Sequence, residues 1–169
     1  MTRYEGEMPP TGHSGDIYVS RGHCRCKALS ATLVLATPPG AISPRACQCA
    51  FCLEHSVVTL TDPQGHLTIE AIEPSLVTYR FWGSDAATLH CARCGTYVAV
   101  LMRKGRGLAG DLNIRGVGLT EFDDVTAIPV DDEREAPVDK LKRRLTQYMP
   151  IELVNITPPQ LTLPHAGTA

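Results

Sequence analysis

The sequence predicts a mainly β fold with one helix near its C-terminal end. Apolar and polar residues alternate in short segments, most clearly over Leu29–Leu35. Turn-forming residues separate these segments at roughly 10-residue spacing, which is typical of β structure. One later segment instead repeats apolar residues at helical spacing. A chain of 169 residues with 43% hydrophobic and 20% charged residues suits one globular domain with its own core.

The strand pattern can be followed along the chain from about residue 17. Leu29–Leu35 predicts a strand with one buried face, and a Pro-Pro-Gly turn follows it. Residues 57–60 and 66–70 flank a second turn sequence, so we expect them to form a hairpin. Residues 76–82 are rich in β-branched and aromatic side chains, and residues 96–102 add one more strand.

Residues 131–149 contain the predicted helix. Pro137 suits its first turn, because proline lacks the N–H that a first turn leaves unbonded. The apolar residues at helical spacing are Val138, Leu141, Leu145 and Tyr148, and the basic residues between them, Lys140, Lys142, Arg143 and Arg144, are expected to be solvated.

The two ends of the chain differ from its middle. Residues 1–16 predict a flexible N-terminal arm, and residues 17–130 contain most of the strand pattern. Residues 150–169 predict a Pro-rich extended tail. Because prolines remove ladder donors, we expect this tail to stay out of a central strand. The tail is expected to be either disordered in solvent or docked along the body of the protein or across a homodimer, and the alternation of its apolar residues favours docking.

Charge and hydropathy exclude several classes of function. Sixteen Lys and Arg face eighteen Asp and Glu, so no positive field attracts nucleic acid or an anionic membrane. The longest apolar run, Val98–Met102, is far too short to span a membrane. The N-terminus lacks the pattern of a secretory signal, so we expect a cytoplasmic protein with reduced thiols. The cysteines are therefore predicted to bind metal rather than to form disulfides.

Seven cysteines fall into three tight clusters. Cys91 and Cys94 have the spacing of a zinc knuckle, and Gly95 supplies the tight backbone that follows it. Cys24 and Cys26 are the candidate partner pair. Four thiolates close the tetrahedral shell of a zinc ion and leave no position for substrate, so this predicts a structural site.

The middle cluster predicts a different site. Cys47, Cys49 and Cys52 are three ligands within six residues, and three thiolates leave the fourth position of zinc open. An exogenous thiol bound there would lose its proton. The alternative is a second structural site closed by a histidine, for which His55 is the first candidate. The count of cysteines thus predicts two zinc ions per chain, one structural and one catalytic.

The cysteine pattern resembles the glutathione-dependent formaldehyde-activating (Gfa-like) family, which includes centromere protein V. The similarity covers about residues 17–130. It rests on all seven cysteines, on Gly22–Cys26 as an opening strand, and on an Asn-x-Arg segment at Asn113 and Arg115. The resemblance implies several coiled antiparallel sheets around zinc. It also assigns Cys24, Cys26, Cys91 and Cys94 to the structural ion, and Cys47, Cys49 and Cys52 to the catalytic ion.

Two functions follow from these observations. The resemblance implies a carbon–sulfur lyase, similar to S-(hydroxymethyl)glutathione synthase, that adds a small-molecule thiol such as glutathione to formaldehyde or another small aldehyde, or reverses that step. Asn113 and Arg115 would contact a substrate carboxylate, and the alternative for Arg115 is a surface ion pair. Phe51 would form a wall of the pocket, and the alternative for it is packing in the core. The alternative is a zinc-binding protein-interaction module without catalysis, because fold alone does not imply chemistry.

Overall fold

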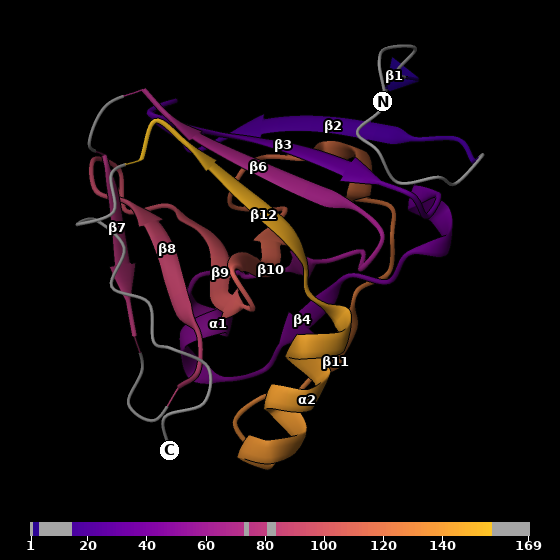
Figure 1. The fold of residues 1–169 in the computed structure, drawn as a ribbon, viewed down its shortest axis with the longest axis vertical. Helices are drawn as coiled ribbons and strands as arrows, with labels where there is room; N and C mark the ends of the chain where they lie inside the picture. Colours follow the sequence, from indigo (N-terminus) through magenta and orange to yellow (C-terminus); the bar gives the residue numbers. More distant parts are fainter. Residues whose placement is uncertain (1, 4–14, 73–74, 81–83, 157–169) are drawn as a thin grey trace.

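The computed structural model describes residues 2–3, 15–72, 75–80 and 84–156, and the fold is mainly β, as predicted (Figure 1). Two α-helices and two short 3₁₀ helices accompany the strands. The strands are β1 (Thr2–Arg3), β2 (Tyr18–His23), β3 (Leu29–Leu35), β4 (Arg45–Cys47), β5 (Thr59–Leu60), β6 (His66–Ala71), β7 (Leu76–Tyr79), β8 (Ala87–Cys91), β9 (Tyr97–Lys104), β10 (Gly107–Asn113), β11 (Ile128–Val130) and β12 (Met149–Val154). The helices are η1 (Pro39–Ala41), α1 (Ala50–Glu54), η2 (Thr120–Phe122) and α2 (Pro137–Gln147).

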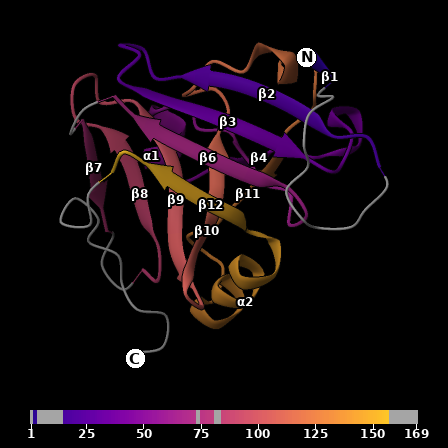
Figure 2. The ribbon, with the colours of Figure 1, turned by 45° about the horizontal axis from the view of Figure 1, so that its top comes forward.

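Within the described residues the strands form one branched sheet. Its main path runs β1-β2-β3-β6-β12-β10-β5-β4-β11, and β7-β8-β9 joins that path at β10. Figures 1 and 2 show β2, β3, β6 and β12 crossing the upper part of the molecule, with β7, β8 and β9 running at a steep angle below them. Strand β10 belongs to both branches, because it pairs with β12 and β5 on the main path and with β9 on the other. Gly110 permits this close approach, since a Cβ there would lie 1.8 Å from the Val100 carbonyl oxygen.

The sheet is mixed, which corrects the expectation of purely antiparallel sheets. Strand β12 runs parallel to β6, with Ile151 opposite Leu67, and β11 runs parallel to β4, with Val130 opposite Cys47. The remaining strand pairs are antiparallel. Both parallel strands come from the C-terminal part of the chain, where the alternation pattern alone carries no information about strand direction.

The expectation that prolines keep residues 150–169 out of a central strand is wrong for the part of this range that belongs to the strand Met149–Val154. This segment is β12, which lies between β6 and β10. Pro150 is exposed and comes one residue before the ladder to β6 begins at Ile151. Its missing N–H therefore removes nothing from the ladder to β6, whereas on the other side Pro150 stands opposite Ala109 in the ladder to β10. The rest of the predicted tail, from residue 157, lies outside the described residues, as does most of the predicted N-terminal arm.

The predicted hairpin between residues 57–60 and 66–70 is also wrong. Both strands exist, but β5 pairs with β4 and β10, whereas β6 pairs with β3 and β12. Asp62 lies in the turn that connects β5 with β6. Its carboxylate accepts hydrogen bonds from the backbone N–H groups of Ala36, Thr37 and Gln64. These bonds tie the turn to the end of β3 instead of closing a hairpin.

Helix α2 has the predicted position, with Pro137 in its first turn, but a different face is buried. Val138 and Leu145 are exposed, whereas Arg143 and Arg144 face the body of the protein with side chains only 14% and 12% exposed. Arg143 pairs with Glu135 and Asp132, and Arg144 pairs with Asp85. Ion pairs with acidic residues outside the helix therefore decide which face of α2 is buried, against the prediction from the spacing of its apolar residues.

The main core lies between the strands of the branched sheet. Alternate residues of β3 are buried as predicted, with Leu29, Leu33 and Leu35 at most 1% exposed. A smaller cluster beneath α2 includes Met102 and Tyr148. No helix in the described part of the chain is long and apolar enough to cross a membrane.

Candidate metal centres

Two hairpin turns bring four of the seven cysteines together. Cys24 and Cys26 lie in the turn between β2 and β3, and Cys91 and Cys94 flank the turn between β8 and β9. The four Sγ atoms lie within 4.8 Å of one another, as the sequence predicted. Gly95 follows in the left-handed region at φ +72°, and its N–H bonds the Cys91 carbonyl oxygen at 2.9 Å.

The geometry of this group fits a metal ion better than disulfides. The Sγ atoms of Cys24 and Cys26 are 3.6 Å apart, and those of Cys26 and Cys91 are also 3.6 Å apart. A disulfide needs about 2.05 Å between sulfurs, whereas neighbouring sulfurs of a tetrahedral zinc site lie about 3.8 Å apart. The four sulfurs therefore have the spacing of ligands to one ion.

Neighbouring groups orient these sulfurs. The Leu29 N–H donates to the Cys24 Sγ at 3.3 Å, and the Thr96 hydroxyl lies 3.1 Å from the Cys94 Sγ. Burial alone would raise the pKa of Cys94, but hydrogen bonds led by that of Thr96 lower it to about 5. Burial raises the pKa of Cys91 to about 12. Cys94 is thus the first of these two thiols to ionise.

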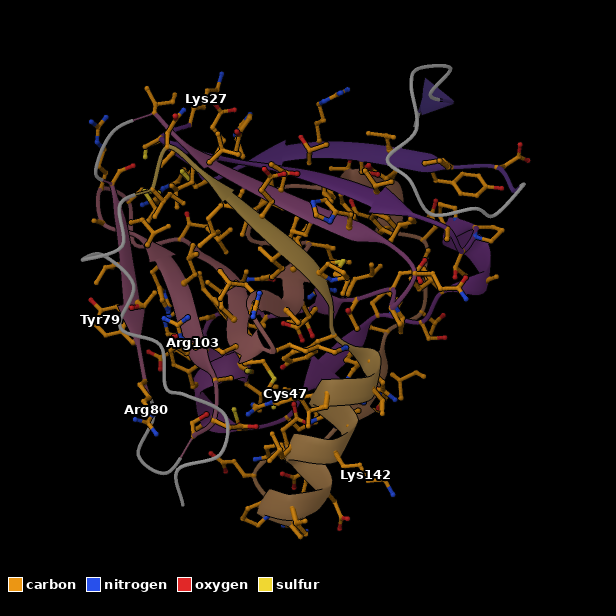
Figure 3. All side chains as sticks on the ribbon, in the orientation of Figure 1. Lys27, Cys47, Tyr79, Arg80, Arg103 and Lys142 are labelled. Atoms are coloured by element: carbon orange, nitrogen blue, oxygen red, sulfur yellow. The ribbon has the colours of Figure 1, made fainter. Side chains whose placement is uncertain are left out.

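The other three cysteines come from one short segment. Cys47 ends β4, Cys49 is the N-cap of α1, and Cys52 lies within α1. Their Sγ atoms also lie within 4.8 Å of one another. The parallel strand β11 supports this segment, because the Gln48 N–H donates to the Val130 carbonyl oxygen at 2.8 Å. In Figure 3, Cys47 lies in the lower half of the molecule, whereas Lys27, next to Cys26, lies at the top.

Hydrogen bonds favour a thiolate at one of these three cysteines. A hydrogen bond from the Cys52 thiol is the largest cause that lowers the pKa of Cys47 to about 5, and the backbone of Asp132 adds another. The same pairing raises the pKa of Cys52. A dipositive ion would replace the shared proton and stabilise all three thiolates.

His55 does not complete this group. The cluster of potential ligands found among the described residues contains only Cys47, Cys49 and Cys52. The His55 ring stacks on Phe51 at 4.4 Å between centroids, and its Nδ1 lies 2.9 Å from the Phe51 carbonyl oxygen. An ion held here would have three protein ligands, which leaves a position for an exogenous ligand.

A hollow of about 240 Å³ borders the three-cysteine group. Cys47 and Cys52 line it together with Gln48, the apolar Val57 and Val58, and Arg115. Arg115 is exposed and makes no ion pair within the described residues. An exposed guanidinium that lines a hollow together with two cysteines suits a ligand that carries a carboxylate.

The other two predicted substrate contacts have different surroundings. Asn113 is 2% exposed, and both polar ends of its side chain bond backbone: Nδ2 donates to the Tyr97 carbonyl oxygen, and Oδ1 accepts from the Val58 N–H. Phe51 is not among the residues that line the hollow. Its ring instead joins His55, His90 and Tyr97 in an aromatic cluster beside α1.

Sequence reasoning missed Tyr97, which lies within electrostatic reach of Cys52, and Asp111, whose charge also acts on Tyr97. Both side chains are buried, and the charge of Cys52 acts on the Tyr97 hydroxyl. One signal was present in the sequence. Asp111 is a carboxylate within the otherwise uncharged segment Gly107–Asn113, and a charge inside a buried strand commonly has a functional reason.

Fold and geometry thus define a mainly β protein with two cysteine groups, one of four and one of three, each able to hold a metal ion. No protein-family model and no curated protein matches the chain. A solved structure from Rhodobacter sphaeroides, determined in a structural genomics programme, is similar with a TM-score of 0.49 and 22% sequence identity, over 65% of this chain and 98% of that one. A similarity at this level says nothing about function, so a functional proposal has to rest on the chemistry of the site.

Proposed function

We propose that this protein is a zinc-dependent carbon–sulfur lyase or synthase of the Gfa type. It would join a thiol such as glutathione to formaldehyde or another small aldehyde, or catalyse the reverse. The observation that carries this proposal is the three-cysteine group, which has no fourth protein ligand among the described residues and borders a hollow. Three protein ligands and one exchangeable position are the usual arrangement of catalytic zinc.

The residues of the chain support this chemistry in distinct ways. Zinc bound by Cys47, Cys49 and Cys52 would supply a stabilised thiolate from an incoming thiol. Arg115 would bind the carboxylate of that thiol and hold its sulfur over the group. The apolar Val57 and Val58 would limit water around the reacting atoms. Cys24, Cys26, Cys91 and Cys94 would hold a structural zinc that joins two hairpin turns.

The exchange of ¹³C-formaldehyde between its free and thiol-bound forms tests this function, because magnetisation-transfer NMR follows it at equilibrium. We expect the zinc-loaded protein to accelerate the exchange with glutathione at least about tenfold over buffer, which corresponds to about 1.4 kcal/mol of barrier. Cys49→Ser should remove the acceleration, and Ser56→Ala, a change in the same hollow that keeps every thiol, should retain it. A wild-type rate equal to that of buffer would favour the non-enzymatic zinc module instead.

A further inference from the structure

The segment that carries the three-cysteine group has little apolar anchoring. Neither β4 nor α1 contains a buried residue. Strand β4 meets β5 at one residue pair, Arg45 with Thr59, and pairs along its length only with β11. Strand β11 ends the main path of the sheet, and its Ile128 and Pro129 are exposed. Burial of apolar surface therefore contributes little to the position of this segment, so polar contacts have to fix it.

Ion pairs connect β4 with α2 through one aspartate. Arg45 Nη2 donates to Asp132 Oδ1 at 2.8 Å, and Arg143 Nη2 donates to the same oxygen at 3.1 Å. Arg143 also bonds both carboxylate oxygens of Glu135, with Nε at 2.9 Å from Oε1 and Nη2 at 2.6 Å from Oε2. None of these four side chains is more than 30% exposed, so salt and water screen the pairs less than they screen pairs on the open surface.

The same network holds β4 on both sides of Cys47. Arg45 lies two residues before Cys47 in the strand. Val130, two residues before Asp132, stands opposite Cys47 in the parallel ladder. After Cys47, the Gln48 N–H donates to the Val130 carbonyl oxygen at 2.8 Å. Cys47 therefore lies between a side-chain contact and a backbone contact to one short segment, residues 130–132.

Other contacts already hold α2 on the body of the protein. Arg144 pairs with Asp85, and Leu141 packs against the smaller core cluster. The contacts of Arg143 lead instead to Asp132 and from there to β4. Groups that orient metal ligands from outside the ligand shell commonly govern the affinity for the ion.

We infer that Asp132 and Arg143 are positioning residues of the three-cysteine group. Through Arg45 they fix the strand that ends in Cys47, and so they hold the three sulfurs at ligand spacing. Three thiolates repel one another, so a segment already fixed in this arrangement binds an ion at a smaller cost in free energy than a mobile segment does. This inference rests on the proposed function, because that function needs an ion at this group. Helix α2 thus belongs to the site, although the ligands lie elsewhere.

Metal affinity, measured for each cysteine group separately, tests this role without relying on turnover. The zinc-loaded full-length protein is titrated with a chromophoric chelator, which should remove the ion of the three-cysteine group before that of the four-cysteine group. Cys49→Ser identifies the weaker class of zinc by removing it. Asp132→Ala and Arg143→Gln should each raise the Kd of the weaker class about tenfold and change that of the tighter class by less than about twofold.

Neighbouring substitutions are the matched controls. Asp131→Ala changes the same loop, but Asp131 pairs with the exposed Arg134 and not with β4. Lys142→Gln removes a charge from an exposed position of α2. Both controls should leave the two Kd values unchanged. The double variant Asp132→Ala/Arg143→Gln should bind zinc about as well as either single variant, because both changes break one chain of contacts.

Cadmium-113 NMR adds a readout of ligand geometry. The cadmium-loaded protein should give two resonances, and Asp132→Ala should shift only that of the three-cysteine group. Arg143→Gln carries the test if Asp132→Ala does not fold. Two metal classes that either folded variant leaves unchanged, or weakens equally, would overturn this role and leave the proposed function standing. Absence of the weaker class in wild type would overturn both.

Discussion

Individual cysteines in the two groups differ in what surrounds their sulfur atoms. Cys24 and Cys91 are buried, and backbone or side-chain donors at Leu29 and Thr96 hold the sulfurs of their group in place. Cys47 and Cys52 instead line a hollow. The first environment suits an ion that stabilises the fold, and the second suits an ion that meets a ligand from solution.

Cys94→Ser and Cys49→Ser should therefore have different effects. Losing a ligand of the four-cysteine group removes metal-binding free energy that is also folding free energy, on the order of several kcal/mol. Cys49→Ser should leave most of the secondary structure intact, because Cys49 belongs to a single short segment. Thermal melts followed by circular dichroism distinguish the two variants. A Cys94→Ser protein that melts as wild type does would contradict the structural role of its group.

Arg115→Ala should weaken the binding of anionic thiols in particular. We expect the Kd for glutathione to rise about tenfold, while the Kd for neutral 2-mercaptoethanol stays nearly constant, because only the former has a carboxylate to lose its partner. Arg106→Ala, which removes an exposed charge between β9 and β10, is the control. Equal weakening of both thiols by Arg115→Ala would show that Arg115 acts on the site as a whole.

Asp111→Asn should stabilise the folded protein above pH 6. The folded pKa of Asp111 is about 6 against an ordinary value of 3.8, so the folded state keeps a proton that the unfolded state loses. Stability contributed by this group is present below the ordinary pKa and is lost as pH rises towards 6. Asn cannot ionise, so the variant should gain on the order of 2 kcal/mol at pH 8 and less at pH 5. Urea unfolding at both values measures this, and a variant less stable than wild type at pH 8 would contradict it.

Among the elements, β12 occupies an inner position of the sheet, between β6 and β10. It pairs with β10 on one side and with β6 on the other, so it joins strands that are far apart in the sequence. Met149 is fully buried and Ile151 is 7% exposed. Removing this strand would expose part of the core and leave β6 paired only with β3, and β10 only with β9 and β5.

Ending the chain at Tyr148 should therefore prevent folding. Ile151→Asn should cost about 2–4 kcal/mol, because it buries an amide in place of a core side chain. Glu152→Gln, a change at the exposed neighbouring position, should be close to neutral. Urea denaturation measures both substitutions, and solubility reports the truncation. A well-folded protein that ends at Tyr148 would mean that β12 is dispensable.

The sequence predicts single elements of this protein well and their pairing poorly. Alternation identifies β3, and Pro137 marks the start of α2, because both signals are local. The partners of β5 and β6 depend on the bonds of Asp62, and the buried face of α2 depends on acidic residues elsewhere in the chain. Such non-local contacts leave no periodic signal.

The candidate site shows the same division. Ligand spacing predicts both cysteine groups, because the distance between neighbouring ligands in a turn is short and local. The hydrogen bonds of Asn113 and the position of Arg115 in one hollow with Cys47 depend on how β4, β5, β9 and β10 are arranged. The surroundings of Asp111 depend also on α2, which carries Arg143 and Arg144. Their roles could be assigned only once the strand order was available.

At the scale of the whole molecule, the two cysteine groups lie in different regions, and each could hold one metal ion. The four-cysteine group joins the β2–β3 and β8–β9 turns, which belong to the two branches of the sheet. The three-cysteine group lies where β4 and β11 meet α1. One ion would thus stabilise the branched sheet, while the other would remain accessible from the hollow beside Arg115.

Zinc-edge X-ray absorption combined with metal analysis tests this division most directly. Metal analysis should give two zinc ions per chain, with an average of about 3.5 sulfur ligands per zinc in the purified protein. Adding 2-mercaptoethanol should raise that average to about 4, because a thiol occupies the open position of the second ion. A single zinc per chain, or two zinc ions whose sulfur count does not change with thiol, would contradict an open three-cysteine site.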